Sequence, residues 1–309
     1  MKKFKSLLAL WNDEMSLKSR DTLHLLELLT SVKNIEEASV EEIEGYLQAI
    51  TENSSHFSKK AKELMATMDK KEINYYEDYI SELENNGKHA ISFMDERYPQ
   101  RLKKIEKPPL MLFVSGQPKI LANSIALVGT REPNDHRVQF AEKIAEKIAE
   151  KGYTVTSGLA RGIDTAGHEG ALKKGKTAAI LPGSLDEIHP KSNSQLAKRI
   201  ERHGALVSEV SGKIDINRRR FVKRNRVISG ISEAIVIGAS GESGGTIHQA
   251  RYAKQQDRNI MLYYREEDKQ SPEKLIRTMD AKPFRSLREL ELRLQELKSN
   301  KNKDLRAYA

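Results

Sequence analysis

Positively charged side chains are concentrated in one part of this 309-residue sequence, between His189 and Arg226. Acidic residues are few there, namely Glu201, Glu209 and Asp215. The basic members are Lys191, Lys198, Arg199, Arg202, Lys213, Arg218, Arg219, Arg220, Lys223, Arg224 and Arg226. Guanidinium and ammonium groups bind phosphate oxygens, and a dense string of them suits a chain of phosphates better than one small nucleotide. The segment therefore predicts a nucleic-acid partner, with a solvated basic surface as the plain alternative.

A second group of residues lies between Val155 and Gly175, in the glycine-rich stretch VTSGLARGIDTAGHEGALKKG. A loop whose N–H groups approach a phosphate needs glycine, and so does a loop that only turns sharply. We expect the backbone here to come close to a phosphate. Asp164 and His168 should brace the loop, because an exposed carboxylate would repel phosphates.

These residues must be positioned by strands and helices that alternate from Ser124 onward. Short apolar runs predict the strands, and amphipathic segments between them predict helices; the runs are SIALVGT, YTVTSG, TAAILPG, ALVSEV, AIVIGAS and NIMLYY. This alternation indicates an α/β fold with a Rossmann-like, doubly wound parallel sheet. Such sheets bind ligands at the carboxyl ends of their strands, where the loops of this chain are rich in glycine, serine and basic residues. The run RRRFVKRNR is expected just before an apolar helix that packs on the sheet.

The sequence divides into three predicted parts. Residues 1–88 form a small α-helical region, with helical spacing in DTLHLLELLTSV and VEEIEGYLQAI. Residues 89–265 hold a connector with one or two strands and then the Rossmann-like domain, and residues 266–309 form a charged helical tail. The formal net charge is +9 and there is no cysteine. No apolar stretch approaches the roughly 20 residues of a membrane span, so we expect a cytoplasmic protein without membrane attachment.

Several motifs resemble, in order and spacing, those of the DprA/Smf DNA-processing proteins. They are GTR at 129–131, SGLARGIDTAGHEGAL at 157–172, LPGSLDEIHPKSN at 181–193, SEV at 208–210 and FVKRNRVISGIS at 221–232. The connector RYPQRLKKIEKPPLMLFVSG at 97–116 is similar to the lead-in of that family. The resemblance implies a non-catalytic protein that binds single-stranded DNA, usually as a homodimer. It also implies a role in protecting DNA and loading the RecA recombinase during natural transformation.

The resemblance also implies a set of DNA-binding residues. The positions that match the family's contacting motifs are Arg131, Ser157, Gly158, Lys191, Phe221, Arg224, Asn225 and Arg226. Gly129, Arg161, Gly183 and Lys223 lie in the same motifs and complete the predicted set. Arg224 and Arg226 should contact phosphates directly, and Phe221 offers one surface for base stacking. Base sequence should therefore matter little. The chain departs from the family pattern at Val222, where proline is usual, and in the segment after Ala239.

Two alternatives remain open. The fold also resembles LOG-like nucleotide phosphoribohydrolases, but Gln249 stands where their loop carries glutamate, and an amide cannot replace a carboxylate in acid–base chemistry. Glu209 could still supply such a group. The second alternative is a nucleotide-sensing module, although no acidic residue follows a GxGxxG loop to hold a ribose. The eight histidines are scattered, so neither a metal site nor a cofactor is expected.

Overall fold

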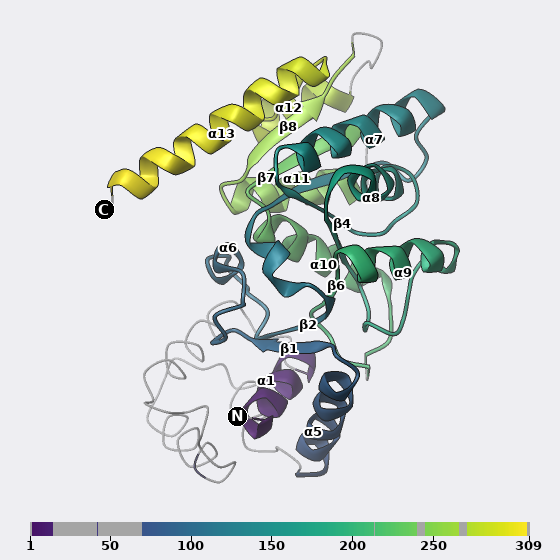
Figure 1. Cartoon of the computed structure of the whole chain (residues 1–309), viewed down its shortest axis with the longest axis vertical. Coiled ribbons are helices and arrows are strands. Elements are labelled where there is room, and N and C mark those ends of the chain that lie inside the picture. The colour runs from purple at the N-terminus through teal and green to yellow at the C-terminus, as the bar shows by residue number, and fades with distance from the viewer. Residues whose placement is uncertain are drawn as a thin grey trace.

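The protein is built on one mixed β-sheet, seen in a computed structural model that describes residues 2–14, 42, 70–212, 214–239, 245–265 and 271–307. Among these residues the sheet has nine strands in the order β1-β2-β6-β5-β4-β3-β7-β8-β9 (Figure 1). The strands are β1 (His89–Ser92), β2 (Met111–Gly116), β3 (Ser124–Gly129), β4 (Thr154–Ser157), β5 (Thr177–Ile180), β6 (Ala205–Ser208), β7 (Ala234–Ala239), β8 (Asn259–Tyr263) and β9 (Lys282–Phe284). In this order, every pairing from β6 through β5, β4, β3, β7 and β8 to β9 is parallel, which confirms the predicted α/β fold.

Helices cover both faces of this sheet. The helical elements are α1 (Lys2–Glu14), α5 (Lys70–Asn85), α6 (Gln100–Lys103), η1 (Pro118–Ala122), α7 (Asp135–Glu150), α8 (Ile163–Lys174), η2 (Lys191–Asn193), α9 (Ser194–His203), α10 (Arg218–Ile231), α11 (Gly245–Gln255), α12 (Ser271–Met279) and α13 (Leu287–Ala307). Residues of α1, α5, α7, α8, α9 and α13 pack on one face. Residues of α6, α10, α11 and α12 pack on the other. Alternate strand residues such as Leu127 and Val128 enter the two cores, as expected for a doubly wound sheet.

The order of winding reverses between β3 and β7. Helices α7 and α8, which follow β3 and β4, lie on one face, whereas α10 and α11 lie on the other. Strand β3 pairs with both β4 and β7, so neighbouring connections leave the sheet in opposite directions there. A crevice forms outside the carboxyl ends of the strands at such a switch point, and ligands bind in it.

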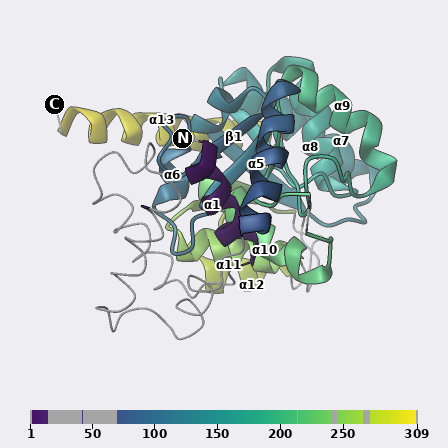
Figure 2. The same ribbon diagram turned by 90° about the horizontal axis from the view of Figure 1, so that it is seen from below.

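Strands β1 and β2 form the antiparallel end of the sheet, where the sequence predicts one or two strands in the connector. Helices α1 and α5 lie side by side against them (Figure 2). Trp11 and Tyr76 are fully buried in this layer. The helical segments expected at residues 21–32 and 40–50 lie outside the described residues, apart from residue 42, which is helical.

The N-terminal helix is joined to the loop that follows β6. The Asn12 side chain accepts a hydrogen bond from the Leu110 N–H (2.9 Å) and donates one to the Glu209 carbonyl. The Asp13 carboxylate accepts hydrogen bonds from the Ser211 N–H (3.2 Å) and the Ser211 hydroxyl. Helix α1 is therefore part of the same packed body as the sheet.

The sheet continues past the predicted boundary at residue 265. Strand β9 pairs with β8, and Phe284 is fully buried. Helix α13 packs Leu290 and Leu294 on the α7 face and extends away from the body toward the C-terminal end (Figure 1). The amphipathic helix expected in the tail is present there, whereas the three-part division of the chain stays a prediction.

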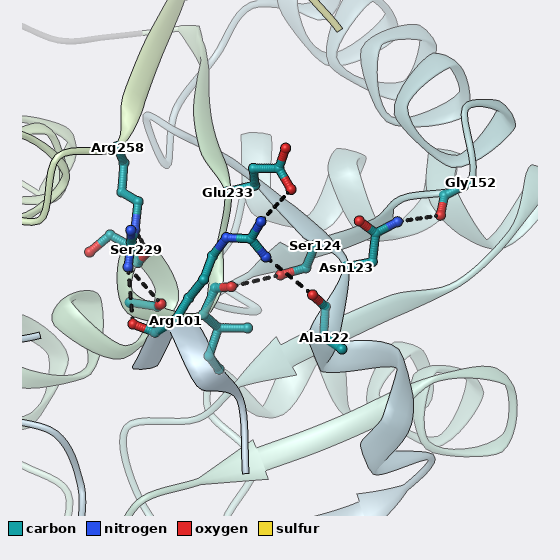
Figure 3. Close-up of polar contacts among 10 residues, drawn as sticks. Arg101, Ala122, Asn123, Ser124, Gly152, Ser229, Glu233 and Arg258 are labelled. Carbon is teal, nitrogen blue, oxygen red and sulfur yellow. Dashed lines mark hydrogen bonds and ion pairs between the residues drawn. The ribbon is translucent and has the colours of Figure 1, made fainter. Parts of the chain in front are cut away.

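Two arginines tie elements together at the amino-terminal edge of the sheet (Figure 3). The Arg258 guanidinium donates to the carbonyls of Ser229, Gly230 and Arg101, each at 3.1 Å. It thereby caps the last turn of α10, whose carbonyls have no partner within the helix. Arg101 pairs with Glu233 at 2.7 Å and donates to the Ala122 carbonyl at 3.2 Å.

Replacing Arg258 tests this cap. The Arg258→Met variant keeps the apolar stem but removes three hydrogen bonds from the guanidinium, so the free energy of unfolding should fall by about 1–3 kcal/mol. The Ser229 and Arg101 carbonyls each keep one backbone N–H donor, from Ser232 and Lys104. Urea denaturation followed by circular dichroism measures the change. Arg251→Met, at an exposed position of α11, is the matched control and should change little. Equal stability of the two variants would contradict the capping role.

The free energy of unfolding should depend on pH through the Asp13 carboxyl. Burial raises the pKa of the Asp13 carboxyl from 3.8 to about 6, against the opposing effect of its hydrogen bonds with Ser211. Between pH 4 and 6, approximately, the folded state holds the proton more tightly than the unfolded state, so this contribution to stability is lost as pH rises.

The Asp13→Asn variant is the comparison, because its amide stays neutral. Relative to this variant, the wild-type protein should lose about 3 kcal/mol of stability between pH 4 and pH 7, measured by urea denaturation. A difference that does not change with pH would show that the carboxyl titrates alike in both states.

Candidate nucleic-acid interface

A cleft of about 750 Å³ lies at the switch point between β3 and β7. Its wall is built by the loop after β3, the first half of α10 and the start of α11. Exposed residues form its rim, including Arg131, His189, Arg218 and His248. Buried residues form its floor: Val128, Asp164, Arg224, Ile228, Thr246 and Gln249. The carboxyl edge of the sheet therefore holds a recess with a basic rim, where the sequence predicts ligand binding.

The glycine-rich loop packs directly against the GTR loop. Gly162 has a φ of 77°, and a Cβ there would lie 2.5 Å from the Thr130 carbonyl oxygen, so both backbone and space require glycine. The Ile163 N–H donates to that carbonyl at 3.2 Å. The Asp164 carboxylate accepts hydrogen bonds from the N–H groups of Gly158 (3.1 Å) and Ala160 (3.3 Å), which confirms its bracing role.

His168 braces a different contact. Its Nδ1 lies 2.7 Å from the Thr177 hydroxyl and joins α8 to β5 rather than to the loop. Burial lowers the pKa of His168 to about 3, with Arg224 adding to the effect, so the ring is neutral at physiological pH.

Arg224 lies beneath the glycine loop instead of pointing into solvent. Its guanidinium donates to the Ile180 carbonyl at 3.0 Å, and Arg224 as a whole is 4% exposed. A Cβ at position 158 would lie 1.6 Å from Nη1, so Gly158 provides the space that the guanidinium fills. Burial lowers the pKa of Arg224 to about 10, and the charge of Asp164 opposes that shift. Arg224 thus stays charged and forms part of the cleft floor.

Arg226 also has a partner within the protein. Its guanidinium forms an ion pair with Glu209 at 2.6 Å, and both side chains are mostly buried. This pair fixes α10 to the loop after β6. It also occupies Glu209, the carboxylate that the hydrolase alternative would use.

The rim holds a cluster of one aromatic and two basic side chains. The Arg131 guanidinium lies 5.6 Å from the centre of the Phe221 ring, within cation–π distance. The His189 ring meets the same ring edge to face, with centroids 5.2 Å apart. Helix α10 begins at Arg218 and is capped by the Asn217 side chain, so the basic run forms the first turns of the helix. The expectation that it precedes the helix is wrong.

The structure brings five of the predicted residues together in the cleft: Gly129, Arg131, Phe221, Arg224 and Asn225. The others lie outside its lining: Ser157, Gly158, Arg161, Gly183, Lys191, Lys223 and Arg226. Of these, the Ser157 hydroxyl is buried and donates to the Leu127 carbonyl at 2.6 Å. Gly183 is buried against Ile216. Arg161, Lys191 and Lys223 are exposed.

Sequence reasoning missed part of the lining. Asn217 and Arg218 line the cleft because α10 starts there, and an asparagine before a helical run is a recognisable N-cap signal. Thr246, His248 and Gln249 come from the start of α11. Residues 240–244, just before it, lie outside the described part of the chain.

The cleft offers little acid–base chemistry. Among the described lining residues the carboxylates are Glu132, which is exposed, and Asp164, which already accepts two backbone hydrogen bonds. Gln249 donates to the Asn225 carbonyl at 3.0 Å. No cluster of three or more histidine, aspartate or glutamate side chains in the described residues is arranged to hold a metal ion.

Comparison with known proteins supplies the family. Residues 89–295, more than half of the chain, match the family model described as DNA recombination-mediator protein A. The chain belongs to this family. Its curated members are named DprA or Smf, and the DprA/Smf resemblance in the sequence motifs is thereby confirmed.

Relatives in sequence match only part of their own length. The DNA processing protein DprA of Bacillus subtilis is 34% identical over 56% of this chain and 60% of its own. Protein Smf of Escherichia coli is 35% identical over 58% of this chain and 48% of its own. This DprA/Smf chain therefore spans about half to three-fifths of the length of these relatives.

Solved DprA structures share the fold. DprA from Streptococcus pneumoniae superposes with a TM-score of 0.74 at 23% identity, covering 93% of this chain and 95% of its own. DNA processing protein A from Helicobacter pylori was solved to describe its single-stranded DNA binding mode. It gives a TM-score of 0.62 at 24% identity, covering 68% of this chain and 96% of its own. In the DprA/Smf chain described here, no helix within the described residues has the length and apolarity to cross a membrane.

Substituting Gly158 tests the link between the loop and Arg224. In Gly158→Ala the methyl group overlaps the guanidinium, so the buried contacts of Arg224 must break and stability should fall by about 3 kcal/mol. Urea denaturation measures the loss. Gly212→Ala, whose new Cβ would lie 3.5 Å from Tyr79, is the matched control with an ordinary contact.

A double-mutant cycle makes the cause specific. Removing the guanidinium relieves the overlap, so Gly158→Ala should cost little in an Arg224→Met background. If the alanine costs the same in both backgrounds, the clash with Arg224 is not the reason for the glycine.

Proposed function

We propose that this DprA/Smf-family chain binds single-stranded DNA without marked sequence preference and acts as a recombination mediator rather than as an enzyme. The observation that carries the proposal is the basic rim of the cleft, where the Arg131 guanidinium lies over the ring of Phe221 and the exposed Arg218 lines the same cleft. Arginine side chains bind phosphate oxygens, and an aromatic ring stacks on any base.

The start of α10 supports a phosphate path. Arg218 and Arg219 are exposed and form no ion pair with another described residue. They stand in the first turn of a helix, where the macrodipole adds to the attraction for an anion. Each phosphate of a DNA strand that passes this turn would meet positive charge.

A recessed aromatic favours a single strand over a duplex. Phe221 is half-buried at the rim of a cleft and is reached best by a base that is not already paired and stacked. The DprA of Helicobacter pylori, which shares the fold, was solved for its single-stranded DNA binding mode. These two observations support single-stranded DNA as the ligand.

The finer parts of the proposal rest on the family resemblance. We propose that the chain protects DNA and helps to load RecA, as in natural transformation or DNA uptake, and that it works as a homodimer in the cytoplasm. A non-catalytic role agrees with the cleft lining, in which Gln249 stands in place of the glutamate of the hydrolases. Glu209, outside the lining, is paired with Arg226.

Removing the rim charges tests the interface. The Arg131→Ala and Arg218→Ala double variant should bind oligothymidine at least tenfold more weakly than wild type, because two charge-assisted contacts are lost. Fluorescence anisotropy at several salt concentrations should also show a slope of log K against log salt that is shallower by about 1.4.

The matched control removes equal charge elsewhere. Arg199→Ala with Arg202→Ala neutralises two exposed arginines of α9, which are not part of the cleft lining, and should leave the slope nearly unchanged. The proposal also requires that the wild-type protein bind oligothymidine more tightly than a duplex of the same length. Equal weakening by both double variants would place the DNA on another surface.

A second candidate function is binding of a free nucleotide. The cleft volume of about 750 Å³ suits one small molecule, and its floor contains apolar residues beside polar ones. Displacement of oligothymidine by micromolar adenosine monophosphate would favour this candidate, and release of free base from it would identify a hydrolase.

A further inference from the structure

We propose that one nucleobase of the bound strand enters the cleft and is held there by Gln249 through its pairing edge. The inference rests on the proposed binding of single-stranded DNA and adds to it a distinct subsite for a base. It rests on the division of the cleft into two zones and on the fixed orientation of one buried amide.

The two zones differ in what they can bind. The rim carries Arg131 and Arg218, which suit phosphates. The floor contains Val128 and Ile228, which are 5% and 1% exposed, and half-buried Ile216 and Val222 stand in the wall. Arg224, which is also in the floor, already donates to the Ile180 carbonyl, and the charge of Asp164 acts against its own. A phosphate would lose hydration on entering between Val128 and Ile228, whereas the flat face of a base gains by burial against them. The floor therefore suits a base and the rim its phosphates.

Gln249 presents an oriented acceptor in that floor. The residue is 2% exposed and lines the cleft. Its Nε2 donates to the Asn225 carbonyl at 3.0 Å, which fixes the nitrogen end of the amide against α10. The oxygen Oε1 is then the end that is left for a ligand. A buried oriented acceptor rewards a ligand with an N–H donor, because an unmatched polar group in such a place is costly.

The pairing edge of a nucleobase supplies that donor. Each of the four DNA bases has an N–H or NH₂ group on this edge, so the contact can hold any of them and agrees with weak sequence preference. The side chain of Asn225 also lines the cleft and carries both a donor and an acceptor for the groups beside it. A base that enters must leave the stack of its neighbours, which costs least in a single strand.

Another glutamine provides a matched control. Gln256 follows the end of α11 and donates through Nε2 to the Arg226 carbonyl at 3.1 Å. It anchors α11 to α10 as Gln249 does, but it is not part of the cleft lining. Leucine at either position removes one bond to α10 and keeps similar volume. Only the change at position 249 removes the acceptor from the cleft.

The test compares oligothymidine with an oligomer of N3-methylthymidine of the same length. Methylation removes the N–H donor of the base and leaves the phosphates unchanged. By fluorescence anisotropy the wild-type protein should bind the methylated oligomer about tenfold more weakly, with the same salt dependence. Gln249→Leu should bind both oligomers alike, whereas Gln256→Leu should discriminate as wild type does.

The outcomes separate this inference from the function on which it rests. If the wild-type protein binds both oligomers equally well, or if Gln249→Leu still discriminates tenfold, the base subsite at Gln249 is wrong although DNA binding stands. If the wild-type protein binds neither oligomer, the proposed function itself fails and the subsite fails with it.

Discussion

The buried guanidinium of Arg224 is the contact on which the candidate interface depends. It enters from α10 on one face of the sheet, reaches the carbonyl of Ile180 at the end of β5, and fills the space left by Gly158. The charge of Asp164 opposes the effect of burial on the Arg224 pKa, and the Asp164 carboxylate holds two N–H groups of the glycine loop. A buried charge is tolerated only with such partners. One side chain thus fixes α10, the glycine loop and the strand ends relative to one another.

Further hydrogen bonds and an ion pair hold α10 and the loop after β6 next to this contact. Arg226 joins α10 to Glu209, and Asn12 and Asp13 of α1 bind the backbone of the same loop at Glu209 and Ser211. Arg258 caps the opposite end of α10. The basic helix is consequently held in its middle and at its C-terminal end, while its first turn remains exposed to a ligand. Binding energy is then not spent on ordering the helix.

Much of this could be predicted from the sequence, because the signals are local. Apolar runs that alternate with amphipathic segments identify the doubly wound sheet, and the loops that follow the strands mark its carboxyl edge as the ligand edge. The sequence also indicates the bracing role of Asp164. It could not show that Arg224 and Arg226 turn inward, since a basic run looks the same whether its charges face solvent or buried partners. Nor could it place Gln249 in the cleft, because that depends on how α11 packs against α10.

The fit between Gly158 and Arg224 limits the order in which the family's sequences can change. A Cβ at position 158 would lie 1.6 Å from Nη1 of the guanidinium, so a side chain there requires the arginine to leave its place against Ile180 or to be lost. Loss of the arginine alone leaves a vacant space and removes the positive charge near the Asp164 carboxylate, which later changes would have to compensate. The two positions, 66 residues apart, should therefore be inherited as a pair, and the glycine should persist wherever the arginine does.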